Sequence, residues 1–167
     1  MASIPEPYRI SLDPSELQFD VIHGYLVRSY WSPGIPRVVV ERAARHSLCV
    51  GAYDGLGAQV GFARLATDHA TFGYFADVFV LEGHRGRGLS AAMVGALMAL
   101  PEVQGMRRLM LATRDAHGLY EKLGWERVNY FLPDGHAAPP PTFGTPGWLP
   151  HVLAEQRACR EDVVVFD

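Results

Sequence analysis

The feature that most constrains the fold of this chain is a buried strand that runs directly into a glycine-rich loop and then a helix, between Tyr74 and Ala99. Residues Phe75 to Leu81 are rich in β-branched and aromatic side chains, which indicates a largely buried strand. The loop His84 to Ser90 contains two glycines, which let the backbone approach a ligand without a Cβ in the way. Apolar residues then recur at helical spacing before Pro101, at Leu89, Met93, Ala96, Leu97 and Leu100.

A helix that opens on such a loop directs backbone N–H groups and the positive end of its dipole toward whatever lies in front of it. This arrangement favours an anion, and phosphate in particular. Arg85 and Arg87 add guanidinium groups, and at least one of them is expected to reach phosphate oxygens. The alternative is a tight strand-to-helix turn with solvated arginines.

Two common phosphate-binding motifs do not fit the loop. A P-loop needs a lysine followed by serine or threonine after its second glycine, and the only lysine in the chain is Lys122. A dinucleotide fingerprint needs a third glycine and an acidic residue at the end of the next strand. Glu102 is a poor candidate for that acidic residue, because it follows a proline that ends a helix.

The run Arg85-Gly86-Arg87-Gly88-Leu89-Ser90 resembles the coenzyme A pyrophosphate loop of the GNAT acetyltransferase superfamily, Gln/Arg-x-x-Gly-x-Gly/Ala. Ser90 stands where the family usually has glycine or alanine, and it is small enough to keep the loop. Downstream, Ala116 to Trp125 resembles the family segment Ala-x-x-Leu-Tyr-x-x-x-Gly-Phe. The two motifs occur in the family's order, and the resemblance covers roughly residues 8 to 130. It implies acetyl-CoA as the co-substrate.

Length and composition agree with one soluble domain over residues 1–167. A chain of 167 residues buries a sizeable core without disulfides or metal. The net charge of −3 argues against a nucleic-acid partner, which needs clustered basic residues. Two cysteines, Cys49 and Cys159, indicate a reducing compartment, and neither a signal peptide nor a membrane-spanning run is visible. We therefore expect a cytoplasmic protein with no membrane partner, as a monomer or homodimer.

The N-terminal half predicts a strand, two helices and three further strands. Tyr8 to Leu12 alternates like a strand, and Asp13-Pro14 predicts the start of a helix that continues through about Ser29. Pro36 opens a second helix that continues to His46. The strands that follow are expected at Leu48 to Tyr53, Gln59 to Ala66 and Phe72 to Leu81, the first two joined by a hairpin at Asp54 to Gly57.

In the C-terminal half, the sequence predicts a strand at Arg107 to Thr113, a helix at Ala116 to Leu123 and a further strand at Trp125 to Leu132. Asp115 is expected to cap the helix. The order predicts an α+β fold with a mostly antiparallel sheet and one parallel pair, formed by the strands before and after the long helix. In the GNAT fold these two strands splay apart, and the pantetheine arm of the coenzyme enters the gap. By that resemblance, the backbone of Asp77, Val78, Phe79 and Val80 lines the arm.

The C-terminal stretch of the chain departs from a compact family member. Residues 133–150 are rich in proline and glycine, which predicts an irregular excursion rather than a helix or central strand. A helix is expected at His151 to Arg160, and the run Val163-Val164-Val165-Phe166 predicts a final strand that completes the sheet. The excursion either covers the acceptor pocket, forms a dimer contact or is a surface loop.

The resemblance assigns Tyr120 to the reacting end of the site, because many family members place a tyrosine hydroxyl near the thioester sulfur at this position. There it would protonate the leaving thiolate; the alternative is packing against the pantetheine arm or the core. The family often has an asparagine seven residues before this tyrosine, and Thr113 takes that place here. Thr113 is therefore expected near the coenzyme.

The acceptor side is expected to contain Asp77, Tyr30, Trp31 and Arg114. Asp77 is an acid in an otherwise apolar strand, where an unpaired carboxylate is costly. Either it accepts the proton of the acceptor amine or binds its charge, or it is a structural acid paired with Arg64 or Arg114. Tyr30 and Trp31 lie in the loop that forms one wall of the acceptor pocket in GNAT proteins, where they would contact an amine; the alternative is core packing.

The sequence favours an N-acetyltransferase that transfers acetyl directly from acetyl-CoA to a small primary amine. Its seven histidines and two cysteines show no metal-ligand spacing, so we expect no metal. No serine-hydrolase elbow is present, so a serine hydrolase is unsupported. The resemblance implies direct transfer with no covalent enzyme intermediate. The alternatives are a non-catalytic acyl-CoA sensor and an enzyme that acetylates a protein N-terminus or lysine.

Overall fold

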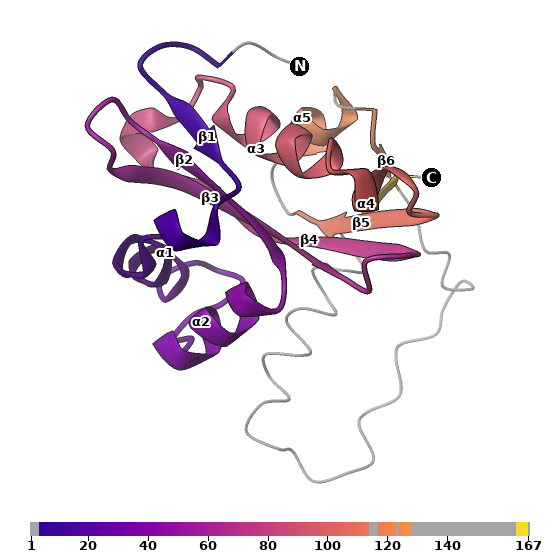
Figure 1. Ribbon diagram of the computed structural model, residues 1–167, viewed down its shortest axis with the longest axis horizontal. Helices are drawn as coiled ribbons and strands as arrows, with labels where there is room; N and C mark the ends of the chain where they lie inside the picture. The colour runs from indigo at the N-terminus through magenta and orange to yellow at the C-terminus, as the bar shows by residue number, and fades with distance from the viewer. Residues whose placement is uncertain (1–3, 114–116, 123, 128–162, 167) are drawn as a thin grey trace, which may run out of the picture.

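The computed structural model describes residues 4–113, 117–122, 124–127 and 163–166, which form one mixed sheet with helices on both faces (Figure 1). The order of strands across the sheet is β1-β2-β3-β4-β5-β7-β6. The strands are β1 Arg9–Ser11, β2 Leu48–Tyr53, β3 Gln59–Thr67, β4 Phe72–Val80, β5 Arg108–Ala112, β6 Glu126–Arg127 and β7 Val163–Phe166. The helices are α1 Phe19–Leu26, α2 Arg37–Arg45, α3 Leu89–Met98, α4 Pro101–Gln104 and α5 His117–Glu121. The expected α+β class is confirmed.

The parallel pair predicted from the sequence is the pair β4–β5, and every other strand pair of the described residues is antiparallel. Its register runs from Phe72 opposite Arg108 to Phe75 opposite Leu111. β4 continues to Val80 on its other neighbour, β3, so the two parallel strands part after Phe75. The family's splayed arrangement is therefore present in this chain.

A β-bulge lies in β4 just beyond the point where it leaves β5. Phe62 pairs with Phe79 and Arg64 with Ala76, so two β4 residues stand opposite one β3 residue. Within the bulge Asp77 has a φ of 55°, a left-handed conformation that aspartate tolerates better than most residues. Because a bulge bends its strand, it increases the divergence of β4 from β5.

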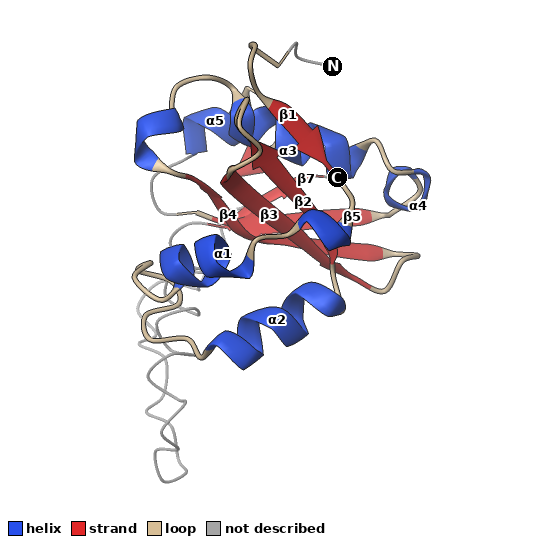
Figure 2. Cartoon of the chain, turned by 60° about the vertical axis from the view of Figure 1, so that its left-hand side comes forward, coloured by secondary structure: helices blue, strands red, loops and turns tan. Residues whose placement is uncertain are grey.

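Helices α1 and α2 cover one face of the sheet and α3 covers the other, as Figure 2 shows from the side. The α1/α2 face is closed by a small core of Ile22, Leu26, Val40, Ala44, Cys49, Phe62 and Phe79. The α3 face holds the larger core, which includes Leu65, Phe75, Leu89, Met93, Leu97 and Trp125. Alternate residues of the central strands supply the two cores, as the pleat requires.

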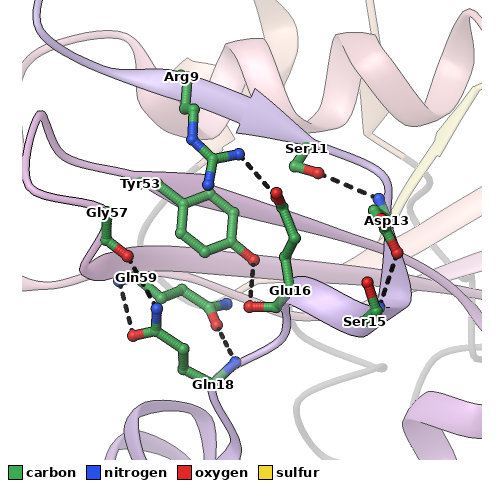
Figure 3. Close-up of polar contacts among 9 residues, drawn as sticks. All are labelled: Arg9, Ser11, Asp13, Ser15, Glu16, Gln18, Tyr53, Gly57 and Gln59. Carbon is green, nitrogen blue, oxygen red and sulfur yellow. Dashed lines mark hydrogen bonds and ion pairs between the residues drawn. The ribbon is translucent and has the colours of Figure 1, made fainter.

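The helix expected from Pro14 to about Ser29 is wrong as a single element, because it is broken after one turn. Asp13 caps a 3₁₀ helix at Pro14–Glu16 by accepting from the backbone N–H of Ser15 at 2.8 Å, and α1 begins only at Phe19. Tertiary hydrogen bonds replace the helical ones (Figure 3). The carbonyl of Glu16 accepts from the Tyr53 hydroxyl at 3.0 Å, and the N–H of Gln18 donates to the Gln59 side chain at 2.7 Å.

The last described strand, β7, lies between β5 and β6 and runs antiparallel to both. Val163 pairs with Ala112 and Phe166 with Leu109, so the expected final strand does complete the sheet. The excursion 133–150, the helix at 151–160 and the cap Asp115 lie outside the described residues. No helix of the described part is long and apolar enough to cross a membrane.

Candidate functional site

The glycine loop forms a pocket of about 180 Å³ where β4 ends and α3 begins. Gly86 and Gly88 have φ values of 75° and 76°, which residues with a Cβ rarely adopt, so the loop shape depends on both glycines. A Cβ built on either glycine would meet nothing within 4 Å, because it would project into open space. The pocket is lined by Val80, His84, Arg85, Gly86, Gly88, Leu89, Ser90 and Ala91.

The start of α3 fits an anion. Gly88 is the N-cap residue, and no side chain caps the helix there. The first backbone N–H groups of the helix therefore face the pocket with the positive end of the dipole behind them. This uncapped ten-residue helix, entered through glycines, matches the backbone cradle that phosphate groups occupy in other proteins. The predicted loop residues Gly86, Gly88, Leu89 and Ser90 are thus brought together at one pocket.

The two loop arginines point in different directions. Arg85 donates from Nε to the carbonyl of Val80 at 3.0 Å and from Nη2 to the Tyr25 hydroxyl at 3.2 Å. Its guanidinium is thereby fixed toward the end of β4 and α1, while its stem lines the pocket. The Arg87 guanidinium instead lies over the ring of Tyr8, 5.5 Å from its centroid. The expected contact of either arginine with phosphate stays a prediction.

The residues expected along the pantetheine arm follow the β4 bulge. Val78 packs partly against the α3-side core, Phe79 is buried on the α1/α2 side, and Val80 reaches the pocket of the glycine loop. Beyond Phe75, β5 no longer pairs with this strand in the part of the chain described above. Among the described residues, no strand pairs with β4 between the bulge and the glycine loop on the side where the arm is expected.

Asp77 lies on the α1/α2 face with both carboxylate oxygens engaged. Arg64 Nε donates to Oδ2 at 2.5 Å, and Trp31 Nε1 donates to Oδ1 at 3.2 Å. The Asp77 side chain is only 9% exposed, so the guanidinium compensates for its burial. Of the two expectations for this acid, the structural pairing with Arg64 is present; a role as proton acceptor stays a prediction.

Aromatic residues surround this ion pair. Trp31 is half-buried, and its ring meets Tyr30 edge to face at a centroid distance of 4.8 Å, while Tyr30 itself is 41% exposed. Tyr25 of α1 stacks on Phe79 at 3.9 Å and lies 6.1 Å from Trp31. The structure therefore brings together the predicted acceptor residues Tyr30, Trp31 and Asp77; Arg114 lies outside the described residues.

Thr113 directly follows β5, and Tyr120 lies in α5. Both are buried, with 4% and 6% of their surface exposed. The Tyr120 ring contacts Trp125 at a centroid distance of 6.0 Å, and Trp125 contacts Phe75 at 5.5 Å. Trp125 thus links the Tyr120 ring to Phe75, the last β4 residue paired with β5. Its proximity to a bound thioester stays a prediction.

Three residues of this region were not singled out from the sequence. Tyr8 and Tyr25 come from the N-terminal segment and α1, and each contacts the glycine loop through a residue more than fifty positions away in the chain. His84 precedes Arg85 and lines the pocket. Of the three, only His84 had a signal in the sequence, through its place next to the motif. Tyr8 and Tyr25 could not be found in this way, because no local spacing identifies a tertiary contact. Among the described residues, no group of histidines, cysteines and acids is arranged to hold a metal.

Comparison with known proteins shows what this chain is similar to. The family model described as an acetyltransferase (GNAT) domain matches residues 44–127. A Gibberella zeae protein assigned as an acetyltransferase is 35% identical in an alignment of 135 residues that covers 69% of this chain and 76% of that protein. A crystal structure assigned to the GNAT family, from Xanthomonas campestris pv. campestris, is 47% identical and superposes with a TM-score of 0.71 over 75% of this chain and 88% of that one. A Deinococcus radiodurans structure, 20% identical over 78% and 90% of the chains, shares the fold with a TM-score of 0.63.

Proposed function

This chain belongs to the GNAT family of acetyltransferases, and from that membership we propose that it transfers an acetyl group from acetyl-CoA to the primary amine of a small molecule. The observation that carries the proposal is the uncapped start of α3, reached through Gly86 and Gly88, at the end of a strand that has parted from its parallel neighbour. The site for an anion thus lies next to a strand edge that is unpaired among the described residues. A phosphorylated carrier with an extended arm needs both, the first for its phosphates and the second for its arm.

Acetyl-CoA, when bound, supplies the acetyl thioester that the amine attacks. The N–H groups at the start of α3 would hold its pyrophosphate, with Arg85, Arg87 and Ser90 around them. The β4 edge from Val78 to Val80 would align the arm through backbone hydrogen bonds, and Thr113 would flank it from the end of β5. The loop would thus bind the charged end of the carrier, while the strand would orient its reacting end.

The acceptor is proposed to enter beside Trp31, Tyr30 and Asp77. An aromatic wall with an acid behind it suits a cationic amine, because the ring faces and the carboxylate both attract positive charge. Trp31 already donates to Asp77, and this contact would hold the carboxylate in place. Asp77 would bind the ammonium group or take its proton, directly or through water, and Arg114 would complete the site.

Direct transfer, without an acyl-enzyme, is supported by the state of Cys49. Burial raises the pKa of this thiol to about 12, so almost none of the nucleophilic thiolate is present at neutral pH. The thiol also donates to the carbonyl of Ala44 at 3.4 Å. A buried, protonated thiol is a poor acyl acceptor.

We therefore expect Cys49 to be unreactive in the folded protein. In a Cys159→Ser variant, a disulfide reagent at pH 8 should label Cys49 at least about 100-fold more slowly than in the same protein unfolded in guanidinium, because the thiol is protonated and inaccessible. Mass spectrometry after incubation with acetyl-CoA should show no acetylated cysteine. Rapid labelling of the folded protein would contradict a buried, protonated Cys49, and an acetyl-cysteine trapped in the wild-type protein would contradict direct transfer.

Tyr120 is proposed to donate a proton to the departing thiolate. We expect Tyr120→Phe to lower kcat about tenfold with an unchanged Kd for acetyl-CoA, a small effect because a thiolate is a good leaving group and departs readily without much help. Stopped-flow or steady-state rates with free-thiol detection measure it. Trp125→Phe is the matched control for packing, since it alters the neighbour of the Tyr120 ring and leaves the hydroxyl. Equal rates for wild type and Tyr120→Phe would remove Tyr120 from the chemistry.

The function is tested by titrating the purified protein with acetyl-CoA and then screening primary amines for release of free thiol. Binding followed by turnover on small amines supports the proposal. Binding without turnover on a broad panel favours the acyl-CoA sensor, and acetylated peptides without small products favour protein acetylation. The net charge of −3 neither favours a basic protein tail as acceptor nor argues strongly against one. We further propose a cytoplasmic monomer or homodimer that needs no nucleic acid or membrane.

A further inference from the structure

A residue from the N-terminal segment contacts the wall of the glycine-loop pocket. The Tyr8 hydroxyl lies 2.9 Å from Nδ1 of His84, and the two rings meet edge to face at 5.7 Å and 89°. His84 lines the pocket, and its ring is half-buried. Tyr8 stands outside the segment matched by the family model, residues 44–127.

We propose that His84 is a phosphate-binding residue of the coenzyme site, and that Tyr8 orients it so that Nε2 donates into the pocket. The inference rests on the proposed function, because it assumes that the pocket receives the pyrophosphate of acetyl-CoA. Its chemical basis is the pair of nitrogens in the imidazole ring. When the tyrosine hydroxyl donates to Nδ1, the ring proton of neutral histidine resides on Nε2, which is then a hydrogen-bond donor.

The position of Tyr8 is fixed by contacts other than the histidine. Its backbone N–H donates to the carbonyl of Pro5 at 3.0 Å, and its ring packs partly against the α3-side core. Arg87 covers the ring with its guanidinium. The hydroxyl is therefore held in place before a ligand arrives, and a donor oriented in advance loses less entropy on binding than a mobile one.

The contacts of Arg85 strengthen the assignment to His84. Two of the donor groups of Arg85 are engaged by the Val80 carbonyl and the Tyr25 hydroxyl. His84 is the polar residue next to Arg85 in the pocket lining, and its Nδ1 contacts the Tyr8 hydroxyl. In this arrangement the other ring nitrogen of His84, Nε2, is the group that would donate a hydrogen bond to an anion.

The test measures affinity by calorimetry for two probes, acetyl-CoA and 3′-phospho-ADP, which carries the phosphates without the arm. His84→Phe should weaken both about tenfold, the loss of one hydrogen bond to a charged group. His84→Gln places an amide nitrogen where Nε2 lies, and it should stay within about threefold of wild type. Tyr8→Phe should weaken both about threefold, since the histidine remains but is no longer oriented.

Two further measurements separate this role from a structural one. S-acetylpantetheine, which lacks the pyrophosphate, should bind all four proteins equally by NMR titration. Long-range ¹⁵N spectra should show the His84 proton on Nε2 in wild type and a mixture of tautomers in Tyr8→Phe. Tyr53→Phe is the matched control, because it removes a tyrosine hydroxyl bonded to the Glu16 carbonyl and away from the pocket. Its thermal stability should fall while its affinities stay unchanged.

The outcomes distinguish this inference from the function on which it rests. If wild type binds neither acetyl-CoA nor 3′-phospho-ADP, the coenzyme assignment fails. If wild type binds both and His84→Phe binds them as tightly, the role of His84 is overturned while the coenzyme site stands. Equal losses in His84→Phe and His84→Gln would overturn the donor at Nε2, and unchanged affinity and tautomer in Tyr8→Phe would overturn the orienting role of Tyr8.

Discussion

Replacing Gly88 with aspartate is expected to weaken acetyl-CoA binding about 1000-fold. The new carboxylate would stand at the N-cap of α3, in the open space where the pyrophosphate is proposed to bind. Two like charges about 4 Å apart near a protein surface repel by about 4 kcal/mol, which corresponds to a factor of about 1000 in Kd. Calorimetric titration of wild type and variant measures the change directly.

Gly57→Asp is the matched control for this substitution. Gly57 also has a left-handed φ, 83° against 76° at Gly88, and open space where its Cβ would be, but it lies in the β2–β3 hairpin. The two variants therefore share the added charge and the same backbone strain, of about 1–2 kcal/mol. We expect Gly57→Asp to bind acetyl-CoA like wild type with similarly reduced stability. Equal loss of binding in both variants, or in neither, would contradict the loop as the phosphate site.

Replacing Arg64 with methionine is expected to lower the free energy of unfolding by about 2–4 kcal/mol. The substitution leaves the Asp77 carboxylate nearly buried without its guanidinium partner, and removing one member of a buried pair costs about 3–5 kcal/mol. The expected loss is smaller here because the Arg64 side chain is 21% exposed, so water partly replaces it. Urea unfolding followed by circular dichroism measures the effect.

The double variant Arg64→Met with Asp77→Asn isolates the cause of that loss. Asparagine tolerates the left-handed φ of 55° at this position, and its oxygen can still accept from Trp31. With no charge left to compensate, the double variant should recover at least about 1 kcal/mol relative to Arg64→Met. A double variant that is less stable than Arg64→Met would show that the guanidinium acts through packing rather than through charge.

Much of the fold could be predicted from the sequence because its signals are local. The β-rich run at Phe75 to Leu81, the glycine loop and the helix after it each follow from the residues they contain, and the two family motifs specify their order. The parallel pair then follows from topology, since a strand, a helix and a strand in one sheet join in this way. Even the isolated valine run at the end of the described chain was enough to predict β7.

The parts that could not be predicted depend on contacts between distant residues. Nothing near Glu16 shows that its carbonyl bonds to Tyr53 instead of continuing a helix, because the partner lies in another strand. The pairing of Asp77 with Arg64 was one of two options, and the choice came from the bulge that turns this residue toward α1. Arg85 similarly carries the family motif, but its direction is set by Tyr25 in α1.

The place of β7 in the sheet has a consequence for how the protein is made. β7 lies between β5 and β6 in the sheet, yet residues 128–162 are synthesised before β7. At about 5–20 residues per second, synthesis of that segment takes roughly 2–7 s, during which the β5 edge has no neighbour on that side. An unpaired edge next to an apolar core invites association with other nascent chains. The nascent polypeptide is therefore exposed to chaperones, and to misassembly on polysomes, in this interval.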